Sequence, residues 1–461
     1  MNILALDLGT SSVRGLVMDA DIRPLPGALA RRKTVLTVDG DGAGTLDPRQ
    51  YLACLVECLD ELHAHGHLRE VDLIAVSAQW HSVLPLGVDD APLGPVLTWL
   101  DTRPEPSSAL AGPVDPVDYH QRTGTWWHRC YWSVRLPWLR EHAGVRVGRF
   151  TGLVEYALGH LLTDAPMSMS QASGTGLLDL STLDWDPEAC ALAGARGEDL
   201  PDLADRDWRG RLRGEYARRW PDLAQASWTA PVGDGAASNV GSGCIDDSRA
   251  AVTVGTSSAV RLLQRMPAHA PQSPLPQRLW RYRVDHDHVV TGAAYSSGGN
   301  LFAWADRVLR LPTGPALERA LGSLPPGEGV PVNVGFGGDR PPGDRSAGSG
   351  ELRGLGFGTT SVQVLAGLMH GVCEQVVDDL VRLESMVGRP TDVVLGGGAM
   401  AASPWWRRTF AQVLTPRRVD FGRHPEIGAT GAALVATGRI TDAVVVADIS
   451  RTDDQAPATP A

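Results

Sequence analysis

The sequence of 461 residues is too long for a single hydrophobic core, and its length predicts two or three domains. It has 43% hydrophobic and 21% charged residues and no apolar run near the roughly 20 residues of a membrane helix, so we expect a globular protein outside the membrane. The net charge of −11 disfavours nucleic acid as a partner, because phosphate backbones bind basic surfaces.

The first predicted unit is a strand, a turn and a second strand over residues 2–19. No basic segment followed by a longer apolar run precedes it, so we expect no export signal and a cytoplasmic location. The turn Gly9-Thr-Ser-Ser12 offers consecutive backbone N–H groups and hydroxyl donors, which suit phosphate oxygens. Arg14 could add positive charge, and Asp7 could hold a hydrated Mg²⁺. An ordinary hairpin turn is the alternative.

The next informative residue is Lys33, the single lysine against 41 arginines. A P-loop requires the pattern G-x-x-x-x-G-K-[ST], and a protein-kinase site requires a lysine of its own. Lys33 lies in Ala30-Arg-Arg-Lys-Thr34, where no glycine framework surrounds it. Both of these ATP-binding folds are therefore excluded. A bound nucleotide must be held by backbone amides, hydroxyls and a metal ion.

An amphipathic helix is predicted over residues 51–63 and a short apolar strand over 73–76, which leads into Gln79-Trp80-His81. Ligands of α/β proteins bind at the carboxyl ends of strands, so Gln79 and His81 could bind sugar hydroxyls and Trp80 could cover a sugar face. A structural role for His81 is the alternative. The segment Thr98–Arg103, with Asp101, offers similar groups and the same ambiguity. A helix is predicted at residues 132–140.

Asp234 lies between Gly233 and Gly235, where little side-chain bulk surrounds the carboxylate. It could approach a ligand closely and take a proton from a substrate hydroxyl as a general base. The alternative is a polar turn in which Asp234 caps its own backbone.

A second turn, Gly255-Thr-Ser-Ser258, repeats the first about half a chain length later, again between apolar strands. A repeat at this period predicts two related domains that face one another. We therefore expect an α/β fold with mixed sheets, with domains at residues 1–245 and 246–440 and a tail at 441–461 whose end is disordered. A long helix is predicted over 360–386, and glycine-rich residues 335–350 are predicted to form a loop.

A predicted strand at residues 393–395 runs into Gly396-Gly-Gly398 and then a helix at 405–414. Glycines there let a flat ring or a ribose lie against the main chain, although a tight strand-to-helix connection is the alternative. The histidines show no metal-ligand spacing, and the six scattered cysteines predict reduced thiols.

Taken in chain order, these segments resemble the FGGY carbohydrate kinases of the actin/hexokinase/Hsp70-type ATPase superfamily. The resemblance covers residues 2–438 and rests on these motifs: Asp7-x-Gly-Thr-Ser-Ser-x-Arg14, Gln79-Trp-His81, Thr98-Trp-x-Asp-Thr-Arg103, Ala172-Ser-Gly-Thr-Gly-Leu-Leu-Asp-Leu180 with Trp185-Asp186, Gly233-Asp-Gly-Ala-Ala237, Gly255-Thr-Ser257, Gly338-Asp-Arg-x-Pro342 and Gly396-Gly-Gly398.

The resemblance implies two ribonuclease H-like (actin-like ATPase) domains, with mixed sheets flanked by helices and ATP in the interdomain cleft. It implies Asp234 as the catalytic base and Asp7 as the Mg²⁺ ligand. The implied ATP ligands are Thr10, Ser11, Ser12, Arg14, Gly255, Thr256, Ser257, Gly397, Gly398 and Met400. The expected sugar-site residues are Gln79, Trp80, His81, Asp101, Asp234 and Gly235.

Within the family, the segments at 98–103 and 172–179 look more like those of gluconate kinases than of glycerol kinases. We therefore expect ATP-dependent phosphorylation of a small sugar or sugar acid, with gluconate as the first candidate and a xylulokinase-like activity as the alternative. Trp80 stands where relatives carry Met, Arg135 where many carry lysine and Asp339 where Glu is customary, and the run 123–132 is unusually aromatic.

Two readings from other classes stay open, namely a non-catalytic ATP-binding regulator and a phosphate-ester hydrolase of the same superfamily. The expected partners are small molecules, with a homodimer as an open alternative and no nucleic acid or membrane.

Overall fold

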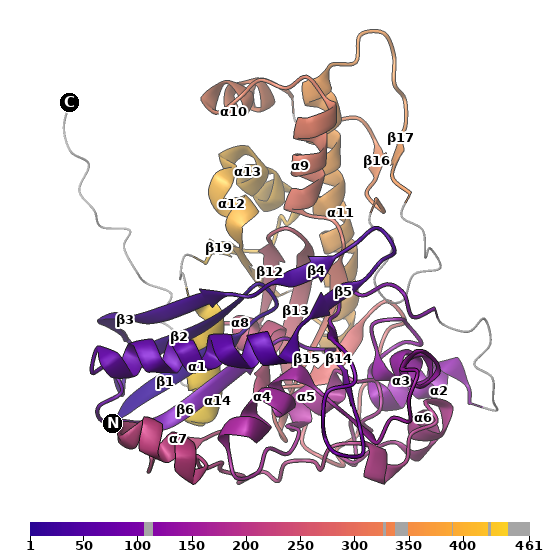
Figure 1. Ribbon diagram of the computed structural model, residues 1–461. Helices are drawn as coiled ribbons and strands as arrows, with labels where there is room; N and C mark the ends of the chain where they lie inside the picture. Colours follow the sequence, from indigo (N-terminus) through magenta and orange to yellow (C-terminus); the bar gives the residue numbers. More distant parts are fainter. Residues whose placement is uncertain (106–113, 326–328, 337–348, 390, 423–425, 441–461) are drawn as a thin grey trace.

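The computed structural model describes residues 1–105, 114–325, 329–336, 349–389, 391–422 and 426–440. Two large sheets organise the chain (Figure 1). The first lies in the lower part of the view with its helix α1, and the second rises from the middle toward helices α9 to α13. None of the helices in the described ranges has the length and apolarity needed to cross a bilayer.

The first sheet has the strand order β10-β6-β1-β2-β3, with β11 also paired to β6. Strands β1, β2 and β3 form an antiparallel meander, and β6, β10 and β11 run parallel to β1. The bounds are β1 Asn2–Leu8, β2 Ser12–Met18, β3 Pro24–Lys33, β6 Val71–Ala78, β10 Ser227–Trp228 and β11 Val232–Gly233.

The second sheet, of order β14-β15-β13-β12-β18-β19, repeats this plan. Strand β12 pairs antiparallel with β13 and parallel with β18, as β1 pairs with β2 and β6. The bounds are β12 Arg249–Val254, β13 Ser258–Arg265, β14 Trp280–Arg283, β15 His288–Tyr295, β18 Asp392–Gly396 and β19 Val419–Phe421. The two Gly-Thr-Ser-Ser turns therefore connect equivalent strand pairs, and the predicted duplication is present in the sheets.

The helices match the predicted segments within a few residues. Helix α11 begins at a capping box between Thr360 and Gln363 and ends at Gly388, whose φ of 71° suits a left-handed cap. The bounds are α1 Pro48–Ala64, α2 Pro116–Thr123, α3 Trp132–His142, α4 Leu153–Leu161, α5 Met169–Ser173, α6 Pro187–Leu192, α7 Gly214–Arg219, α8 Asp234–Gly241, α9 Gly299–Val308, α10 Pro315–Gly322, α11 Ser361–Val387, α12 Gly398–Ala402, α13 Pro404–Val413 and α14 Ile427–Ala436.

Small sheets and hairpins complete the described chain. Their strands are β4 Leu36–Val38, β5 Gly44–Leu46, β7 Leu84–Leu86, β8 Val96–Leu97, β9 Arg149–Thr151, β16 Val332–Asn333 and β17 Glu351–Leu352. Most of the predicted loop at 335–350, with Asp339, and the predicted tail at 441–461 lie outside the described residues.

The middle of strand β1, from Ile3 to Leu6, is apolar because both of its faces are covered. Leu4 and Leu6 belong to one core with residues of α1, whereas Ile3 and Ala5 belong to another with residues of α8 and α14. The second core also contains Leu263, Trp280, Tyr282 and Val290 from the second sheet. The two sheets are therefore joined by a shared apolar core.

Helix α14 follows the second sheet in sequence but packs on β1 and β6 of the first (Figure 1). It crosses α8 at very short range. A Cβ atom on Gly241 would overlap the carbonyl oxygen of Ile427, and one on Gly431 would overlap that of Ala237. Only glycine fits at these positions. The predicted division at residue 245 assigns α14 to the second domain, although its contacts here are with the first sheet.

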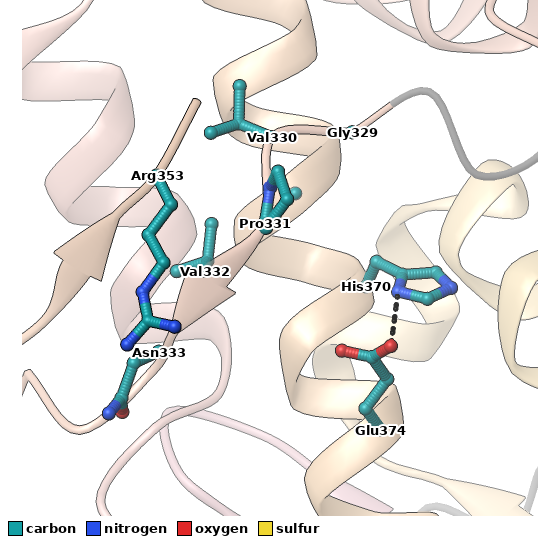
Figure 2. Close-up of a pocket in the computed structure, with 9 residues that line it drawn as sticks. Gly329, Val330, Pro331, Val332, Asn333, Arg353, His370 and Glu374 are labelled. Carbon is teal, nitrogen blue, oxygen red and sulfur yellow. Dashed lines mark ion pairs between the residues drawn. The ribbon is translucent and has the colours of Figure 1, made fainter. Parts of the chain in front are cut away.

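A cavity of about 510 Å³ lies on the second unit, between the β16–β17 hairpin and α11 (Figure 2). Arg353 and Asn333 line it from the hairpin, and His370, whose Nδ1 lies 3.5 Å from Glu374 Oε1, lines it from the helix. None of the predicted site residues lines this cavity.

Candidate active site between the two sheets

The first turn connects β1 to β2 in a register that places Asp7 opposite Arg14. The amide of Gly9 donates to the carbonyl of Ser12 over 3.1 Å, which closes the turn. Ser11 is exposed, whereas the side chain of Ser12 is only 3% exposed. The Thr10 hydroxyl donates to Gln79 Oε1 over 2.8 Å and accepts from Trp99 Nε1 over 3.2 Å. The first turn and the Gln79 segment are thus held together.

Asp7 lies at the centre of a group of charges. Ser77 Oγ donates to its Oδ1 over 3.3 Å, and Arg14 Nη1 lies 3.8 Å from Oδ2. The same Arg14 nitrogen lies 3.1 Å from Glu426 Oε2, at the start of α14. Burial raises the pKa of Asp7 to about 6; Arg14 opposes this, and Asp234 adds to it. A divalent cation would stabilise the ionised form of such a carboxyl.

These residues fit a magnesium ion held largely by water and phosphate. In the described part of the chain, no three His, Cys, Asp or Glu residues converge to hold a metal. Mg²⁺ commonly binds through one or two carboxylates, with substrate phosphates and water as its other ligands. Asp7 is the carboxylate that the first turn presents for this role.

The second turn is closed by a hydrogen bond from the Gly255 amide to the Ser257 carbonyl over 2.9 Å. Thr256 is exposed, and Ser258 is buried and donates to the carbonyl of Ser297 over 2.6 Å. The amide of Gly299, at the start of α9, donates to the carbonyl of Gly255 over 2.7 Å. The second turn therefore lies beside the amino end of a helix, whose dipole favours an anion.

The glycine-rich turn at 396–398 lies against the strand that leads into the second turn. Gly397 has a φ of 103°, and a Cβ atom there would overlap the Val254 carbonyl, so glycine is required. Gly398 is exposed, whereas Met400 is only 2% exposed and packs in the core of the second sheet. The Met400 side chain therefore belongs to this core. Its expected contact with adenosine stays a prediction.

Asp234 is the first residue of α8, and it is exposed. Its Oδ1 accepts a hydrogen bond from the Gly235 amide over 2.7 Å. Asp234 lies near enough to Asp7 for its negative charge to contribute to the raised pKa of Asp7. The structure thus brings together the predicted base and the predicted metal ligand, which are separated by more than two hundred residues of sequence.

Trp80 supports the Asp234 turn from beneath. The ring would overlap a Cβ atom on Gly233, and such an atom on Gly235 would lie 2.7 Å from it. The indole N–H donates to the carbonyl of Ser170 over 2.8 Å, and the residue is 6% exposed. These contacts make Trp80 a packing platform for the base. The predicted contact between Trp80 and a sugar face stays a prediction.

His81 adopts a left-handed backbone conformation, with a φ of 69°, which is costly for a residue other than glycine. Its Nδ1 lies 2.6 Å from the Gly174 carbonyl oxygen, and its ring meets those of Tyr131 and Tyr282 edge to face. Arg135 Nη1 donates to the His81 carbonyl over 2.8 Å. The strained residue is therefore held from three sides, and its predicted contact with the sugar stays a prediction.

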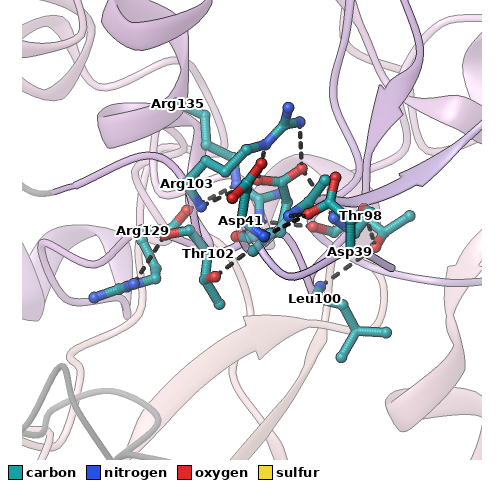
Figure 3. A network of polar contacts seen from close by, with 12 residues as sticks. Asp39, Asp41, Thr98, Leu100, Thr102, Arg103, Arg129 and Arg135 are labelled. Carbon is teal, nitrogen blue, oxygen red and sulfur yellow. Dashed lines mark hydrogen bonds and ion pairs between the residues drawn. The ribbon is translucent and has the colours of Figure 1, made fainter. Parts of the chain in front are cut away.

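Figure 3 shows a polar network around Thr98, Thr102 and Arg103. Asp101 of the same segment is fully buried. Its Oδ2 accepts from Arg103 Nη2 over 2.6 Å and from the Gly44 amide over 3.1 Å, and its Oδ1 accepts from Arg103 Nε over 3.0 Å. Arg135 binds the Thr98 carbonyl of the same network over 2.7 Å. Both Asp101 oxygens are engaged in holding the loop, so we do not retain Asp101 among the sugar ligands proposed below.

Three residues of this site were not singled out from the sequence, namely Glu426, Tyr282 and Arg261. Glu426 pairs with Arg14 across 412 positions, and no local pattern marks it. Arg261 did carry a signal, because it follows the second turn much as Arg14 follows the first.

Comparison with known proteins identifies the family. Residues 2–241 match the N-terminal domain of the FGGY family of carbohydrate kinases, and residues 250–438 match its C-terminal domain. The chain belongs to this family, and it is a carbohydrate kinase. A gluconokinase of Bacillus subtilis (strain 168) is 23% identical over 473 residues, which cover 97% of this chain and 90% of the relative. A xylulose kinase of Klebsiella pneumoniae is 24% identical over 448 residues, covering 95% and 90%.

Solved structures agree on the fold. A ligand-bound xylulose kinase and a gluconate kinase, both from Lactobacillus acidophilus, each give a TM-score of 0.84 at 22% identity. The matches cover 98% of this chain and 93% and 92% of theirs. The two-domain actin-like ATPase fold predicted from the sequence is confirmed. Since gluconate and xylulose kinases match about equally well, these similarities leave the acceptor unresolved.

Proposed function

We propose that the chain transfers the γ-phosphoryl group of ATP to a hydroxyl of a small sugar acid, with gluconate as the first candidate. The observation that carries this proposal is that Asp7, beside the first turn, lies within the field of Asp234, and that Asp234 lies beside Arg261, which follows the second turn. Family members are ATP-dependent kinases that generally use Mg²⁺. Turns whose N–H and hydroxyl groups face solvent suit phosphate oxygens, and a carboxylate at a helix start suits a base.

Thr10, Ser11 and Arg14 bind phosphate oxygens from the first unit, and the backbone of Gly255–Ser257 binds them from the second. Gly397 and Gly398 leave room for the ribose and adenine beside the second turn. When bound, ATP supplies the phosphoryl group; Asp7 would hold the Mg²⁺ ion, which would offset negative charge on the phosphate oxygens.

Asp234 accepts the proton of the acceptor hydroxyl, which becomes nucleophilic as the proton leaves. His81 and Gln79 bind further hydroxyls of the acceptor. The buried Gln79 side chain is held by the Thr10 hydroxyl and interacts with the Tyr51 side chain, which would orient its amide for this role.

Buried positive charge supports an acid as the acceptor. Arg135 and Arg281 are at most 2% exposed, and burial lowers the pKa of each to about 10. The hydrogen bonds described for both end on neutral groups, four carbonyls for Arg135 and Thr291, Ser273 and Met266 for Arg281. Arg135 holds His81, and Arg281 precedes Tyr282, which packs on His81. The Arg135 cation beside His81, whose charge Asp101 offsets in part, favours an anionic ligand.

The test is ADP release by the purified chain with MgATP and gluconate, xylulose, ribulose, glycerol, erythritol or no acceptor. We expect gluconate to give the largest kcat/KM and glucitol, its neutral analogue, a value at least about tenfold lower, since one buried charge interaction is worth a few kcal/mol. A preference for xylulose would favour the xylulokinase-like alternative. Release without acceptor would favour a hydrolase, and ATP binding without release a regulator. The cytoplasmic location and the homodimer stay predictions.

A further inference from the structure

Arg261 of the second sheet reaches the residue next to the proposed base. It lies on β13, three residues after the second turn, and pairs with Gly292 of β15. The side chain runs over this glycine, since its Cγ lies 3.2 Å from the point where a Cβ on Gly292 would be. Its Nε and Cζ then come within 3.1 and 3.5 Å of the equivalent point on Gly235. The guanidinium therefore lies at the start of α8, beside Asp234.

The groups around Asp234 include a like charge, and the Arg14 cation nearby is already shared, so the Arg261 cation can balance the Asp234 carboxylate. Asp7 on β1 carries a like charge, and Tyr51 on α1 also lies within the field of Asp234. Arg14 lies between Asp7 and Glu426, at 3.8 and 3.1 Å, so its charge is already shared by two carboxylates.

Arg261 faces Asp234 from the other sheet. Burial lowers the pKa of Arg261. The Asp234 and Tyr282 side chains oppose this effect and favour the charged guanidinium. Its Nε has no hydrogen-bond partner among the described residues.

We propose that Arg261 is a positioning residue, whose guanidinium draws the Asp234 carboxylate toward the second sheet and offsets its repulsion by Asp7. This inference rests on the proposed function of Asp234 as the base. Strand β13 would then serve both reactants, because it begins at the turn that binds phosphate and carries, three residues on, the cation that holds the base. Separation of β13 from α8 would release the base and stop turnover.

The test compares R261M, which removes the charge, with R261K, which keeps it, using MgATP and the best acceptor of the wild type. A misplaced catalytic group costs about 100-fold in rate, so we expect R261M to lower kcat by roughly that factor and to leave the KM for ATP within about twofold. R261K should recover at least about tenfold of the loss. Arg265, exposed at the end of the same strand, gives the control R265M, which should match the wild type.

Two results would overturn the inference. One is an unchanged kcat in R261M, and the other is a loss confined to the KM of acidic acceptors, which would make Arg261 an acceptor ligand instead. A second measurement needs no substrate: melting temperatures of the wild type, D234N, R261M and the double variant. Non-additive shifts support the contact, and additive shifts oppose it. If the wild type phosphorylates no acceptor, the proposed function fails, whereas this cycle still tests the Arg261–Asp234 pair.

Discussion

The hydroxyl groups of Tyr131 and Tyr282 lie 2.7 Å apart next to His81, so one hydrogen bond joins the second sheet to the first unit. Both residues are nearly fully buried, and burial holds the pKa of Tyr131 well above its ordinary value. Tyr131 therefore remains neutral across the physiological range. It ties strand β14 of the second unit to the segment that precedes α3 in the first.

Removal of one of these hydroxyls leaves the other buried with a lost partner. We expect Y282F to lower the free energy of unfolding by about 1–3 kcal/mol, measured by urea denaturation. The double variant Y131F/Y282F removes both groups and should be closer to the wild type than the two single losses together. If the double variant instead loses the sum of the two single losses in free energy of unfolding, the two hydroxyls do not stabilise the fold as a pair.

Replacement of Asp234 tests the chemistry directly. We expect D234A to lower kcat by about 10²–10⁴-fold, because general bases contribute that much, while ATP binding measured by calorimetry changes little. Asp118, exposed on α2, provides the control D118A, which should retain full activity. Substantial turnover by D234A would assign the base to another group.

Glu155 predicts a dependence of stability on pH. The residue is 5% exposed, neither carboxyl oxygen has a hydrogen-bond partner in the described chain, and burial raises its pKa to about 8. The folded protein therefore keeps a proton that the unfolded chain releases above pH 4.5, its ordinary pKa. The resulting stability is fully present below that pH and is lost as the pH rises through about 8.

In urea unfolding, the free energy of unfolding of E155Q should depend less on pH between pH 5 and 8 than that of the wild type. The total difference across this range should be on the order of a few kcal/mol. The exposed Glu215 gives the control E215Q, whose profile should follow the wild type. Equal slopes in E155Q and the wild type would show that Glu155 is not the titrating group.

The crossing of α8 and α14 predicts an opposite outcome for two glycine substitutions. G431A places a methyl group on the Ala237 carbonyl, so we expect a loss of about 1–3 kcal/mol and a lower melting temperature. G159A, in α4, meets nothing nearer than 4.0 Å and should gain up to about 1 kcal/mol through its better helix propensity. Similar effects of both would contradict the close crossing.

The sequence predicted those parts of the molecule that local patterns determine. Both Gly-Thr-Ser-Ser turns, the glycine turn at 396–398 and the long helix α11 lie where the order of apolar and small residues places them. The burial of Trp80 and Asp101 depends instead on glycines far away in the chain, Gly233 and Gly235 for Trp80 and Gly44 for Asp101, which no local pattern reveals. The return of α14 to the first sheet, which delivers Glu426 to Arg14, is equally non-local.

The single lysine has a practical consequence. Lys33 is exposed at the end of β3, in register with Ser12, and the next residue, Thr34, donates through its amide to the Ser11 carbonyl over 3.2 Å. An amine-reactive fluorophore would therefore modify one side chain, a few residues from the nucleotide side of the first turn. The arginine-based site would stay chemically untouched, and the emission of the dye could follow binding in real time.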